Sequence, residues 1–492
     1  MSLSSSLPED LYAESIQFLY ERINYERLSS GTSRYPFRLK RTCELVSRLG
    51  LDDYLYYASA PDQFANQERK PPIPLVHIAG TKGKGSTATM VGAILTASGL
   101  RTGVYTSPHL NDLEERFRVD GQPCLPNDLV ALIDRVRSVV LDMESDERGA
   151  ISFFELTTAL ALLHFHVKSC DAIVLEVGLG GRLDSTNVCL PTVTAITSIG
   201  LDHQRVLGNT LAEIAFEKAG IIKPGIPVVS GVRSGEAAEV IGTRANEESC
   251  RLYQLGRDFE VQCQPDPVWG SRIDYHGEKE PLRHSITANL ALDGAHQAHN
   301  AALAISIVEL LRAQGTPANQ ESIETGLSAV RCPGRIERFQ LNDDITLILD
   351  TAHNDDSIEA LCSCLRQRQQ LYENGLAVVF GTSNDKNAGS MLSALREVTE
   401  TIVLTQYTSN PRFTSSTHLL QIAEKHSFAT VQVTDDPVDA CRQAKQLVHP
   451  GGTIVVCGSF FLAAETRPWV QSQQIDSCTS TQKTTQSNAQ ES

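Results

Sequence analysis

The 492-residue chain lacks an excess of basic side chains, because 43 Lys and Arg stand against 59 Asp and Glu, a formal charge of −16. The phosphates of DNA or RNA require a basic surface, so this balance argues against nucleic acid as the principal partner and leaves only a local basic pocket for small anions. The chain also lacks an apolar stretch long enough to span a bilayer, and its first ten residues lack the basic cluster and apolar core of a signal peptide. We therefore expect a cytoplasmic protein with neither a membrane nor a nucleic acid as partner.

CxxC pairs are absent, although the chain contains 12 cysteines, which are scattered, as at Cys43, Cys170 and Cys457. Metal sites and disulfide frameworks are built from cysteines at short, regular spacings. Dispersed cysteines instead favour buried thiols that pack as small hydrophobic side chains.

A single core rarely supports a chain of this length, so we expect two main domains with ragged ends. Apolar runs alternate with helical patterns up to about residue 230 and again between about 346 and 456, which predicts two α/β units with parallel sheets. The first domain is placed at residues 1–328, with a small β-rich annex at 232–290 and a polar junction at 315–329. The second, smaller domain is placed at 329–469, and the Gln/Ser/Thr-rich residues 470–492 are expected to be a disordered tail.

The most informative stretch is the loop GTKGKGST at residues 80–87, which follows an apolar run at 75–79 and precedes a helical pattern at 86–98. Small residues let backbone N–H groups close on a phosphate, while the helix N-terminus and a lysine supply positive potential. The loop departs from GxxxxGK[S/T], since Gly85 separates Lys84 from Ser86, and glycine clusters are often plain turns. The flanking strand and helix favour a cradle for a nucleoside triphosphate.

Three polar residues, Ser107, Glu176 and His203, lie at or near the ends of predicted strands. Ligands of open parallel sheets gather at the carboxyl ends of the strands, and a triphosphate needs a divalent cation with oxygen ligands. Glu176 is the natural acidic partner of the loop. Each residue also has an ordinary explanation: Glu176 as a loop cap or a partner of Arg182, Ser107 as a turn residue before a proline, and His203 as a loop histidine.

Lys218 lies on the apolar stripe of a helix predicted over residues 210–219, seven positions after Leu211. A lysine in that position must reach solvent, pair with an acid or lose its charge. Reaching solvent near the helix end is the ordinary outcome. A neutral amine can instead take up CO₂ and become a carbamate anion, and the sequence leaves both outcomes open.

In the second half, a strand predicted at 345–349 delivers Asp350, followed closely by His353. An aspartate in that position can accept hydrogen bonds from ribose hydroxyls, and His353 offers a donor. Arg335 lies just past the junction and is suited to a phosphate. The ordinary alternatives are a surface cation for Arg335 and a turn cap for Asp350.

Ten ordered motifs occur within residues 35–465: HIAGTKGKGST, TSPHL, FFELT, LEVGLGGRLDSTN, GLDH, EKAGIIK, HQAHNAALA, PGRIE, DTAHN and FGTSNDK. In combination they resemble the folylpolyglutamate synthase and dihydrofolate synthase family of the Mur ligase superfamily. The resemblance implies a P-loop-containing parallel-sheet N-terminal domain followed by a smaller Rossmann-like α/β domain. It also implies an ATP- and Mg²⁺-dependent ligase, monomeric as family members usually are. The enzyme would phosphorylate a carboxylate of folate or dihydropteroate and then join the acyl phosphate to the amine of L-glutamate.

The resemblance assigns roles to residues at matching positions. The nucleotide would be contacted by Thr81, Lys82, Gly83, Lys84, Gly85, Ser86, Asn300, Arg335 and Asp350. Magnesium would be bound by Ser107, Glu176 and His203, and the catalytic residues would be Lys84, His203 and a carbamylated Lys218. The substrate would be contacted by Ser152, Phe153, Phe154, Glu155, Leu183, Asp184, Ser185 and, in the second domain, His353.

Two motifs depart from the family pattern, since DTAHNDD replaces the commoner DGAHNP and NDKN replaces DKD. Both affect contacts to ribose or glutamate rather than the magnesium site. Two alternative functions are a Mur-type ligase for another carboxylate, against which TSPHL and LEVGLGGRLDSTN argue, and a nucleotide-binding regulator without catalysis, against which the intact Lys84 and Lys218 argue. The sequence leaves open whether the enzyme makes dihydrofolate, extends polyglutamate or does both. The FFELT and LDSTN positions favour both, because they resemble bifunctional bacterial members.

Overall fold

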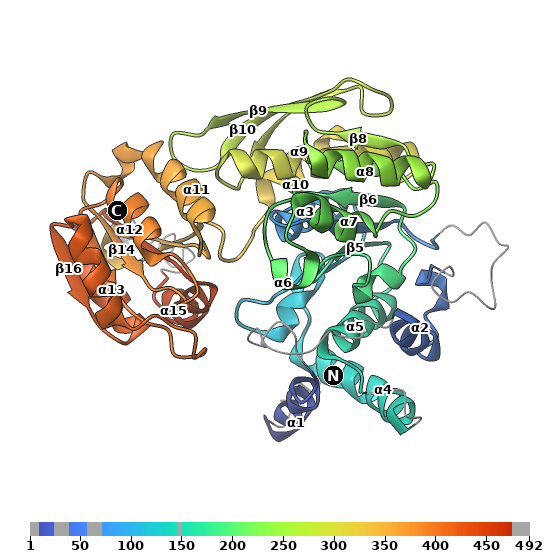
Figure 1. Cartoon of the computed structure of the whole chain (residues 1–492), viewed down its shortest axis with the longest axis horizontal. Coiled ribbons are helices and arrows are strands. Elements are labelled where there is room, and N and C mark those ends of the chain that lie inside the picture. The colour runs from blue at the N-terminus through green and yellow to red at the C-terminus, as the bar shows by residue number, and fades with distance from the viewer. Residues whose placement is uncertain (1–8, 24–38, 57–70, 146–149, 475–492) are drawn as a thin grey trace, which may run out of the picture. The chain divides into compact units, whose positions relative to one another are not determined.

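The structure is a computed structural model, and it describes residues 9–23, 39–56, 71–145 and 150–474 (Figure 1). The chain forms two compact units. Unit 1 comprises Met1–Gln264, Gly270–Ala291 and Ala295–Val330, and unit 2 comprises Pro265–Trp269, Leu292–Gly294 and Arg331–Ser492. The chain therefore enters unit 2 three times, twice by short segments and finally at Arg331.

An eight-stranded sheet in the order β4-β3-β2-β5-β1-β6-β7-β8 forms the core of unit 1. Its strands are β1 (Leu75–Ala79), β2 (Thr102–Tyr105), β3 (Phe117–Val119), β4 (Gln122–Pro123), β5 (Ala172–Glu176), β6 (Val193–Ile196), β7 (Val228–Ser230) and β8 (Leu252–Gln254). Six of them, from β2 to β8 across the sheet, are parallel, and β3 and β4 form an antiparallel hairpin at one edge. Every residue of β1, β2, β5 and β6 is buried, as expected of strands covered on both faces. The predicted parallel sheet is confirmed.

Helices cover both faces of this sheet (Figure 1). One face carries α3 (Lys84–Ala97), α9 (Ala295–Ala313) and α10 (Gln320–Ala329), with α3 packed on β1, β2 and β5. The other face carries α1 (Glu9–Tyr20), α2 (Leu39–Arg48), α4 (Pro126–Ser145) and α5 (Phe153–Val167), whose apolar side chains form one cluster with Leu75, Tyr105 and Leu175. Three further helices, α6 (Gln204–Leu207), α7 (Leu211–Ala219) and α8 (Glu236–Glu247), follow β6 and β7.

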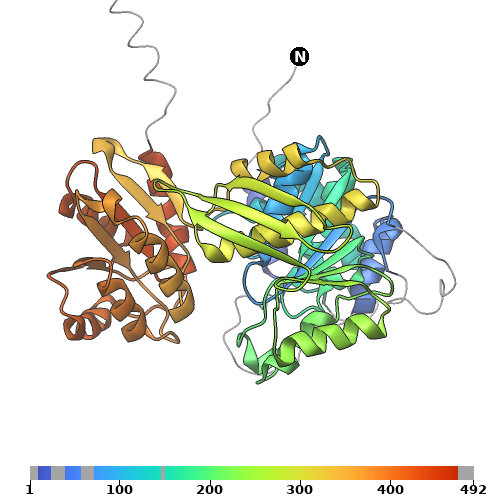
Figure 2. The same ribbon diagram turned by 90° about the horizontal axis from the view of Figure 1, so that it is seen from above.

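Residues 232–290 differ from the expected β-rich annex. Helix α8 occupies 236–247, because Ala237, Ile241 and Ala245 are buried at helical spacing, and β8 joins the main sheet. Only β9 (Phe259–Pro265), β10 (Ser271–Gly277) and β11 (Ser285–Leu290) form a separate three-stranded sheet, whose long strands are visible in Figure 2. The buried stripe of α8 has one large apolar residue among many polar ones, so its helical period was not recognised.

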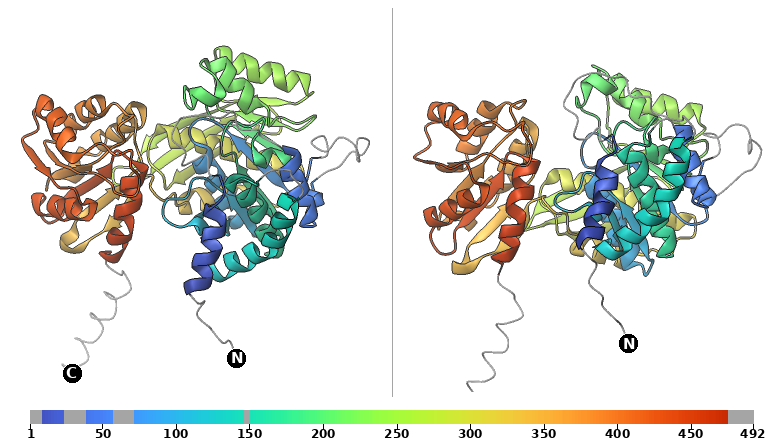
Figure 3. Two further views of the ribbon diagram at one scale, coloured as in Figure 1. Left: turned by 60° about the horizontal axis from the view of Figure 1, so that its bottom comes forward. Right: turned by 90° about the horizontal axis from the view of Figure 1, so that it is seen from below.

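Unit 2 contains a six-stranded sheet in the order β12-β13-β17-β14-β15-β16. Its strands are β12 (Glu337–Gln340), β13 (Thr346–Leu349), β14 (Leu376–Phe380), β15 (Thr401–Leu404), β16 (Thr430–Val433) and β17 (Thr453–Cys457), of which only the edge strand β12 is antiparallel. The helices are α11 (Asp355–Arg366), α12 (Ala388–Arg396), α13 (Ser416–Ala423), α14 (Pro437–Leu447) and α15 (Phe460–Ser472). They cover both faces of the sheet, which Figure 3 shows from two further sides. The second predicted α/β unit with a parallel sheet is confirmed, with one antiparallel strand at its edge.

Two predicted boundaries fall inside helices. The polar stretch 315–329 contains α10, whose Ile323 and Leu327 are buried in unit 1, so its polar composition belongs to an exposed helix face rather than to a linker. Helix α15 continues past Val470, where the tail was expected to begin, because Val470 is itself buried. The remaining tail, residues 475–492, lies outside the described residues.

The described cysteines form no disulfide, and all of them except Cys263 are buried, which confirms the prediction of buried thiols. Among the described helices, none combines the length and the apolar composition needed to cross a membrane.

Candidate active site

The phosphate loop connects β1 to α3 with a tight turn. Gly83 is the N-cap of α3 and adopts a left-handed conformation, with φ +85°. A Cβ atom on Gly83 would lie 2.3 Å from Oδ1 of Asn300, so the position requires glycine for both its backbone and its space. Asn300, on α9, is buried, and its Nδ2 donates to Gln297 Oε1 at 3.0 Å. The structure thus places Asn300 close to the phosphate loop. The family resemblance had assigned both to the nucleotide site.

The loop after β6 holds the phosphate loop from the opposite side. Thr81 N donates to Ser198 O at 2.8 Å, and Gly200 N donates to Thr81 Oγ1 at 3.0 Å. The carbonyl of Lys82 accepts hydrogen bonds from the hydroxyls of Thr197 and Ser198. Sequence reasoning assigned no role to Thr197 or Ser198.

Glu176, at the carboxyl end of β5, lies between the phosphate loop and the loop that follows β2. The residue is 4 % exposed, and its Oε2 accepts a hydrogen bond from Ser107 N at 3.1 Å. A Cβ on Gly85 would lie 3.2 Å from the same oxygen, so the start of α3 approaches the carboxylate closely. Arg182, considered as a partner of Glu176, instead forms an ion pair with Glu217 at 2.8 Å. Ser107 and Glu176 are therefore brought together beside the predicted phosphate site.

His203 caps the short helix α6 in a left-handed conformation, with φ 50°, and its side chain is 60 % exposed. Asp202 precedes it and accepts a hydrogen bond from His203 N at 2.9 Å. Both residues line one pocket together with Thr81, Lys84 and Lys218. Asp202 is a pocket residue that sequence reasoning missed, although it stands within the quoted motif GLDH.

Lys218 is buried, with 5 % of its surface exposed, and its Nζ donates to Gly80 O at 2.9 Å. The pKa of this lysine is lowered to about 7, chiefly by burial and also by the positive charge of Lys84, while Asp202 and Asp184 oppose the shift. A substantial fraction of Lys218 is therefore neutral near pH 7. The ordinary alternative, in which the amine reaches solvent at the helix end, is wrong.

The donor set fits a magnesium ion beside a triphosphate. In the described ranges, no group of three or more His, Cys, Asp or Glu side chains is placed to hold a metal by itself. The predicted set instead contains one carboxylate, one hydroxyl and one imidazole. Magnesium in nucleotide sites commonly takes one or two protein oxygens and completes its shell with phosphate oxygens and water. The buried carboxylate of Glu176 beside the start of α3 meets that requirement.

The loop between β5 and β6 is braced from within. Asp184 is buried and accepts hydrogen bonds from Leu179 N, Thr186 N and Thr186 Oγ1, and burial raises its pKa. Ser185 is also buried, so of the three predicted substrate contacts only Leu183 is partly exposed. Asn187, which was not predicted, donates to Arg182 O and Gly220 O and accepts from Lys223 Nζ at 2.7 Å. It thereby ties this loop to the end of the helix that carries Lys218.

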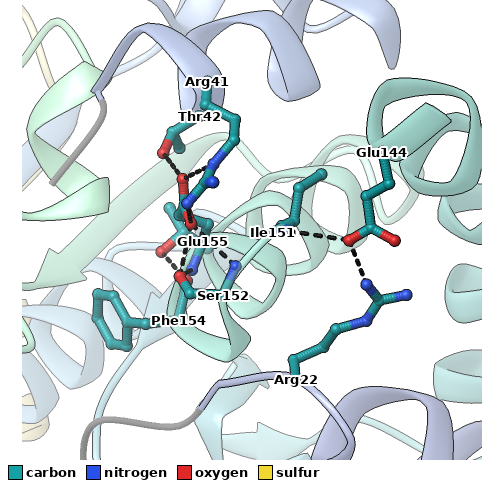
Figure 4. A network of polar contacts seen from close by, with 9 residues as sticks. Arg22, Arg41, Thr42, Glu144, Ile151, Ser152, Phe154 and Glu155 are labelled. Carbon is teal, nitrogen blue, oxygen red and sulfur yellow. Dashed lines mark hydrogen bonds and ion pairs between the residues drawn. The ribbon is translucent and has the colours of Figure 1, made fainter. Parts of the chain in front are cut away.

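The FFELT segment opens helix α5 with a buried polar network (Figure 4). Ser152 is the N-cap, and the Glu155 carboxylate accepts hydrogen bonds from Ser152 N and Ser152 Oγ. Arg41 donates to both oxygens of the same carboxylate, and Thr42 donates to one. Burial alone would raise the pKa of Glu155, but the hydrogen bonds from Arg41 and Ser152 hold it below its usual value. The side chains of Ser152 and Glu155 are thus engaged inside unit 1.

The two phenylalanines of this segment differ. Phe153 is fully buried and stacks on Tyr20 with ring centroids 5.6 Å apart. Phe154 is only half-buried, and its ring lies over Gly178, where a Cβ would come within 2.4 Å of Phe154 Cζ. Gly178 lines the pocket described above. Of the four predicted substrate contacts at residues 152–155, Phe154 is the one that reaches the pocket lining.

The remaining predicted residues belong to unit 2. Asp350 follows β13, is buried, and accepts hydrogen bonds from Ile336 N at 2.8 Å and Ala352 N at 2.7 Å, as a turn cap does. Burial raises its pKa, and the charge of Arg335 opposes that shift. The Arg335 side chain is exposed, and the ring of His353 bonds through Nδ1 to Thr351 O at 2.8 Å. Within unit 2, Arg335 and Asp350 are therefore neighbours, and His353 follows Asp350 by three residues in the loop before α11.

Comparison with known proteins identifies the family. Residues 78–308 match the Mur ligase middle domain, and residues 334–460 match the Mur ligase glutamate ligase domain. The chain is 33% identical over 394 residues to folylpolyglutamate synthase of Lacticaseibacillus casei, covering 80% of this chain and 89% of the relative. It is 32% identical over 397 residues to dihydrofolate synthase/folylpolyglutamate synthase of Bacillus subtilis, covering 80% and 90%. The chain belongs to the folylpolyglutamate synthase family of Mur ligases.

A solved structure of a family member agrees with the fold. Mycobacterium tuberculosis folylpolyglutamate synthase, crystallised with ADP and AMPPCP, superposes with a TM-score of 0.77 at 30% identity, covering 95% of this chain and 99% of that one. The resemblance found in the ten sequence motifs is therefore confirmed, and so is the predicted fold of a P-loop parallel-sheet domain followed by a second α/β domain.

Family motifs explain which site residues the sequence revealed. Motif matching pointed to the loop, to Glu176 and to Lys218, which are candidates for contact with a ligand. It does not find residues such as Thr197 and Asn187, whose side chains bond to backbone groups of another segment. Their only sequence signal was a position directly after a strand or within a quoted motif.

Proposed function

We propose that this chain is an ATP-dependent ligase that joins L-glutamate to the carboxylate of a folate or dihydropteroate through an acyl phosphate. Family membership and the names of the relatives support the reaction class. The observation that carries the proposal is one pocket in unit 1, where the phosphate loop meets His203 and the buried Lys218, with Glu176 beside the same loop.

The residues of the pocket suit phosphoryl transfer to a carboxylate. Such a transfer brings two anions together, so the site must supply cations and fixed donors. Lys84 and the backbone N–H groups at the start of α3 are proposed to hold the triphosphate, with Thr81, Lys82, Gly83, Gly85 and Ser86 lining it. Ser107, Glu176 and His203 are proposed to bind Mg²⁺. When bound, this ion neutralises phosphate charge and aligns the transferred group.

Lys218 is proposed to carry a carbamate. The neutral amine attacks CO₂, a C–N bond forms as one C=O π bond of CO₂ breaks, and one proton leaves to solvent, so that a neutral amine becomes a carbamate anion. Two features support this step: Lys218 is 5 % exposed, and its pKa is lowered to about 7, chiefly by burial. The carbamate would supply a fixed negative charge beside Lys84. Without the carbamate, the positive charge of Lys84 repels the protonated amine of Lys218.

Unit 2 is proposed to supply the remaining nucleotide contacts, with the exposed Arg335 on a phosphate and Asp350 on the ribose. His353 is proposed to contact the substrate. In unit 1, Phe154 and Leu183 are proposed to contact the pterin substrate directly, because they are the partly exposed members of the predicted set. Ser152, Phe153, Glu155, Asp184 and Ser185 are buried, so we propose that they shape this side of the pocket rather than reach far into it.

The test is an activity assay with purified protein, ATP, Mg²⁺ and L-glutamate, to which either dihydropteroate or tetrahydrofolate is added. ADP release that depends on a pterin substrate is expected, with mass spectrometry identifying the glutamylated product. Release with both substrates would make the enzyme bifunctional, as the name of the Bacillus subtilis relative describes that protein. ATP binding without release under any condition would favour a regulator, and release only with other carboxylates would favour another Mur-type ligase.

The protein is further proposed to act as a cytoplasmic monomer. Light scattering coupled to size-exclusion chromatography should give a mass near 53.7 kDa. A mass near twice that value would show that the protein is a dimer.

A further inference from the structure

Two hydroxyl groups at the end of β6 converge on a single carbonyl of the phosphate loop. Thr197 Oγ1 donates to Lys82 O at 2.7 Å, and Ser198 Oγ donates to the same oxygen at 2.9 Å. Lys82 N in turn donates to Ser198 Oγ at 2.9 Å. Both polar backbone groups of Lys82 are thus bonded to the neighbouring strand end, although the Lys82 side chain itself is exposed.

The direction of this carbonyl decides what the loop presents to an anion. A trans peptide is planar, so a carbonyl and the N–H of the next residue point in opposite directions. With Lys82 O directed at Thr197, the N–H of Gly83 is directed away from β6. A cradle for phosphate needs N–H groups that converge on the anion, and a carbonyl oxygen turned the same way would repel it.

We infer that Thr197, assisted by Ser198, is a positioning residue for the nucleotide, which holds the Lys82 carbonyl away from the phosphates and the Gly83 N–H toward them. This inference rests on the proposed binding of ATP to the loop. Thr197 is 5 % exposed, so bulk water does not readily replace its hydroxyl when the hydroxyl is removed.

The space around the Thr197 hydroxyl shows that the contact is built into the loop. A Cβ on Gly80 would lie only 1.9 Å from Thr197 Oγ1, so the hydroxyl occupies the volume that any side chain at position 80 would need. The carbonyl of the same Gly80 accepts the hydrogen bond from Lys218 Nζ. Gly80 therefore has the Thr197 hydroxyl next to its Cα and the Lys218 amine hydrogen-bonded to its carbonyl.

Two further hydrogen bonds restrain the segment that carries His203. Thr81 N donates to Ser198 O, and Gly200 N donates to Thr81 Oγ1, so the backbone between Thr197 and His203 is held by the loop it supports. Loss of the Thr197 hydroxyl is therefore expected to make both the phosphate loop and the segment from Thr197 to His203 less rigid. The effect should appear in nucleotide binding before it appears in glutamate binding.

Three substitutions separate this role from packing. Thr197→Val keeps the shape and removes the donor, whereas Thr197→Ser keeps the donor. Thr194→Val is the matched control, because Thr194 lies on β6, the strand that Thr197 directly follows, is fully buried, and has no hydrogen-bond partner for its hydroxyl in the described part of the chain. Ser198→Ala removes the second donor at a more exposed position and serves if Thr197→Val folds poorly.

The measurements are the dissociation constant of Mg²⁺-ADP by isothermal titration calorimetry, the melting temperature, and KM for ATP and L-glutamate. Thr197→Val is expected to weaken ADP binding and raise KM for ATP by about tenfold, the effect of one well-placed buried hydrogen bond. Thr197→Ser and Thr194→Val should stay within about twofold of the wild type, and Ser198→Ala should weaken binding about threefold. KM for L-glutamate should change in none of them.

Wild-type ADP affinity in Thr197→Val, or equal losses in Thr197→Val and Thr194→Val, would overturn the positioning role and leave the proposed reaction standing. Failure of the wild-type protein itself to bind ADP would overturn the proposed function, and the inference with it.

Discussion

Lys218 Nζ and Gly80 O are joined by a hydrogen bond of 2.9 Å that connects the end of α7 to the first residue of the phosphate loop. The donor is buried, and its nearest described charges are Lys84, Asp202 and Asp184. A carbonyl can accept a hydrogen bond from an ammonium, an amine or the N–H of a carbamate. The contact therefore fixes the position of the nitrogen while leaving its chemical state free to change.

Replacement of Lys218 by alanine is expected to lower kcat by at least about a hundredfold, because the site loses the charge that carbamylation would place beside Lys84. Lys425→Ala, at an exposed lysine of unit 2, is the control and should leave kcat unchanged. Depletion of CO₂ should lower the activity of the wild type, and added bicarbonate should restore it. Activity of Lys218→Ala close to that of the wild type would remove the carbamate from the mechanism.

The same lysine predicts a pH dependence of stability. Its pKa is about 7 in the folded chain against 10.5 for an ordinary lysine, so between these values the unfolded chain binds a proton that the folded chain does not. The contribution of Lys218 to stability is therefore unfavourable below pH 7, becomes more favourable as the pH rises, and levels off above 10.5.

Lys218→Met removes this dependence and keeps the apolar stem. The difference in melting temperature, variant minus wild type, should be largest near pH 6.5 and should fall steadily toward pH 10, as measured by differential scanning fluorimetry in CO₂-free buffer. Lys223, whose pKa burial lowers to about 8, contributes in the same direction to both proteins and cancels in the difference. A difference independent of pH would show that Lys218 keeps its ordinary pKa.

The sequence predicted the strands well because most of them are continuous apolar runs, and burial on both faces leaves little freedom in composition. The apolar runs that form β5 and β17 are examples, because every residue of both strands is buried. Helix α8 was missed for the opposite reason. It buries only three residues, two of them alanine, and its other residues are more exposed to solvent and mostly polar. Polarity was also misleading at α10, whose exposed face resembles a linker in composition.

The site was predictable to the extent that its residues carry unusual chemistry. A lysine on an apolar stripe drew attention to Lys218, and a glycine-rich loop drew attention to residues 80–87. The sequence could not show that Glu155 would be bound by Arg41, more than a hundred positions earlier, because no local pattern links two residues that meet only in the folded chain. The same holds for Thr197 and Lys82.

The Arg41 and Glu155 pair predicts a large effect on stability. Both side chains are almost fully buried, and removal of one partner leaves a buried charge without compensation, which typically costs about 3–5 kcal/mol. Glu155→Ala should therefore lower the free energy of unfolding of unit 1 by roughly that amount, measured by urea denaturation. Glu44→Ala, in the exposed pair with Arg48, is the control and should change it by less than about 1 kcal/mol. Equal effects of the two substitutions would show that the network in Figure 4 contributes no more to stability than a surface ion pair does.

Phe154 predicts a change in substrate affinity without a change in stability of the same size. Its ring is half-buried over Gly178 at the pocket, whereas Phe153 beside it is fully buried. Phe154→Ala should raise KM for the pterin substrate by about tenfold, as expected when one aromatic contact is lost, and leave KM for ATP within about twofold. Phe153→Ala should instead lower the melting temperature strongly, since it empties a core position. If Phe154→Ala raised both KM values equally, the ring would act on the pocket as a whole, and its assignment to the pterin side would be wrong.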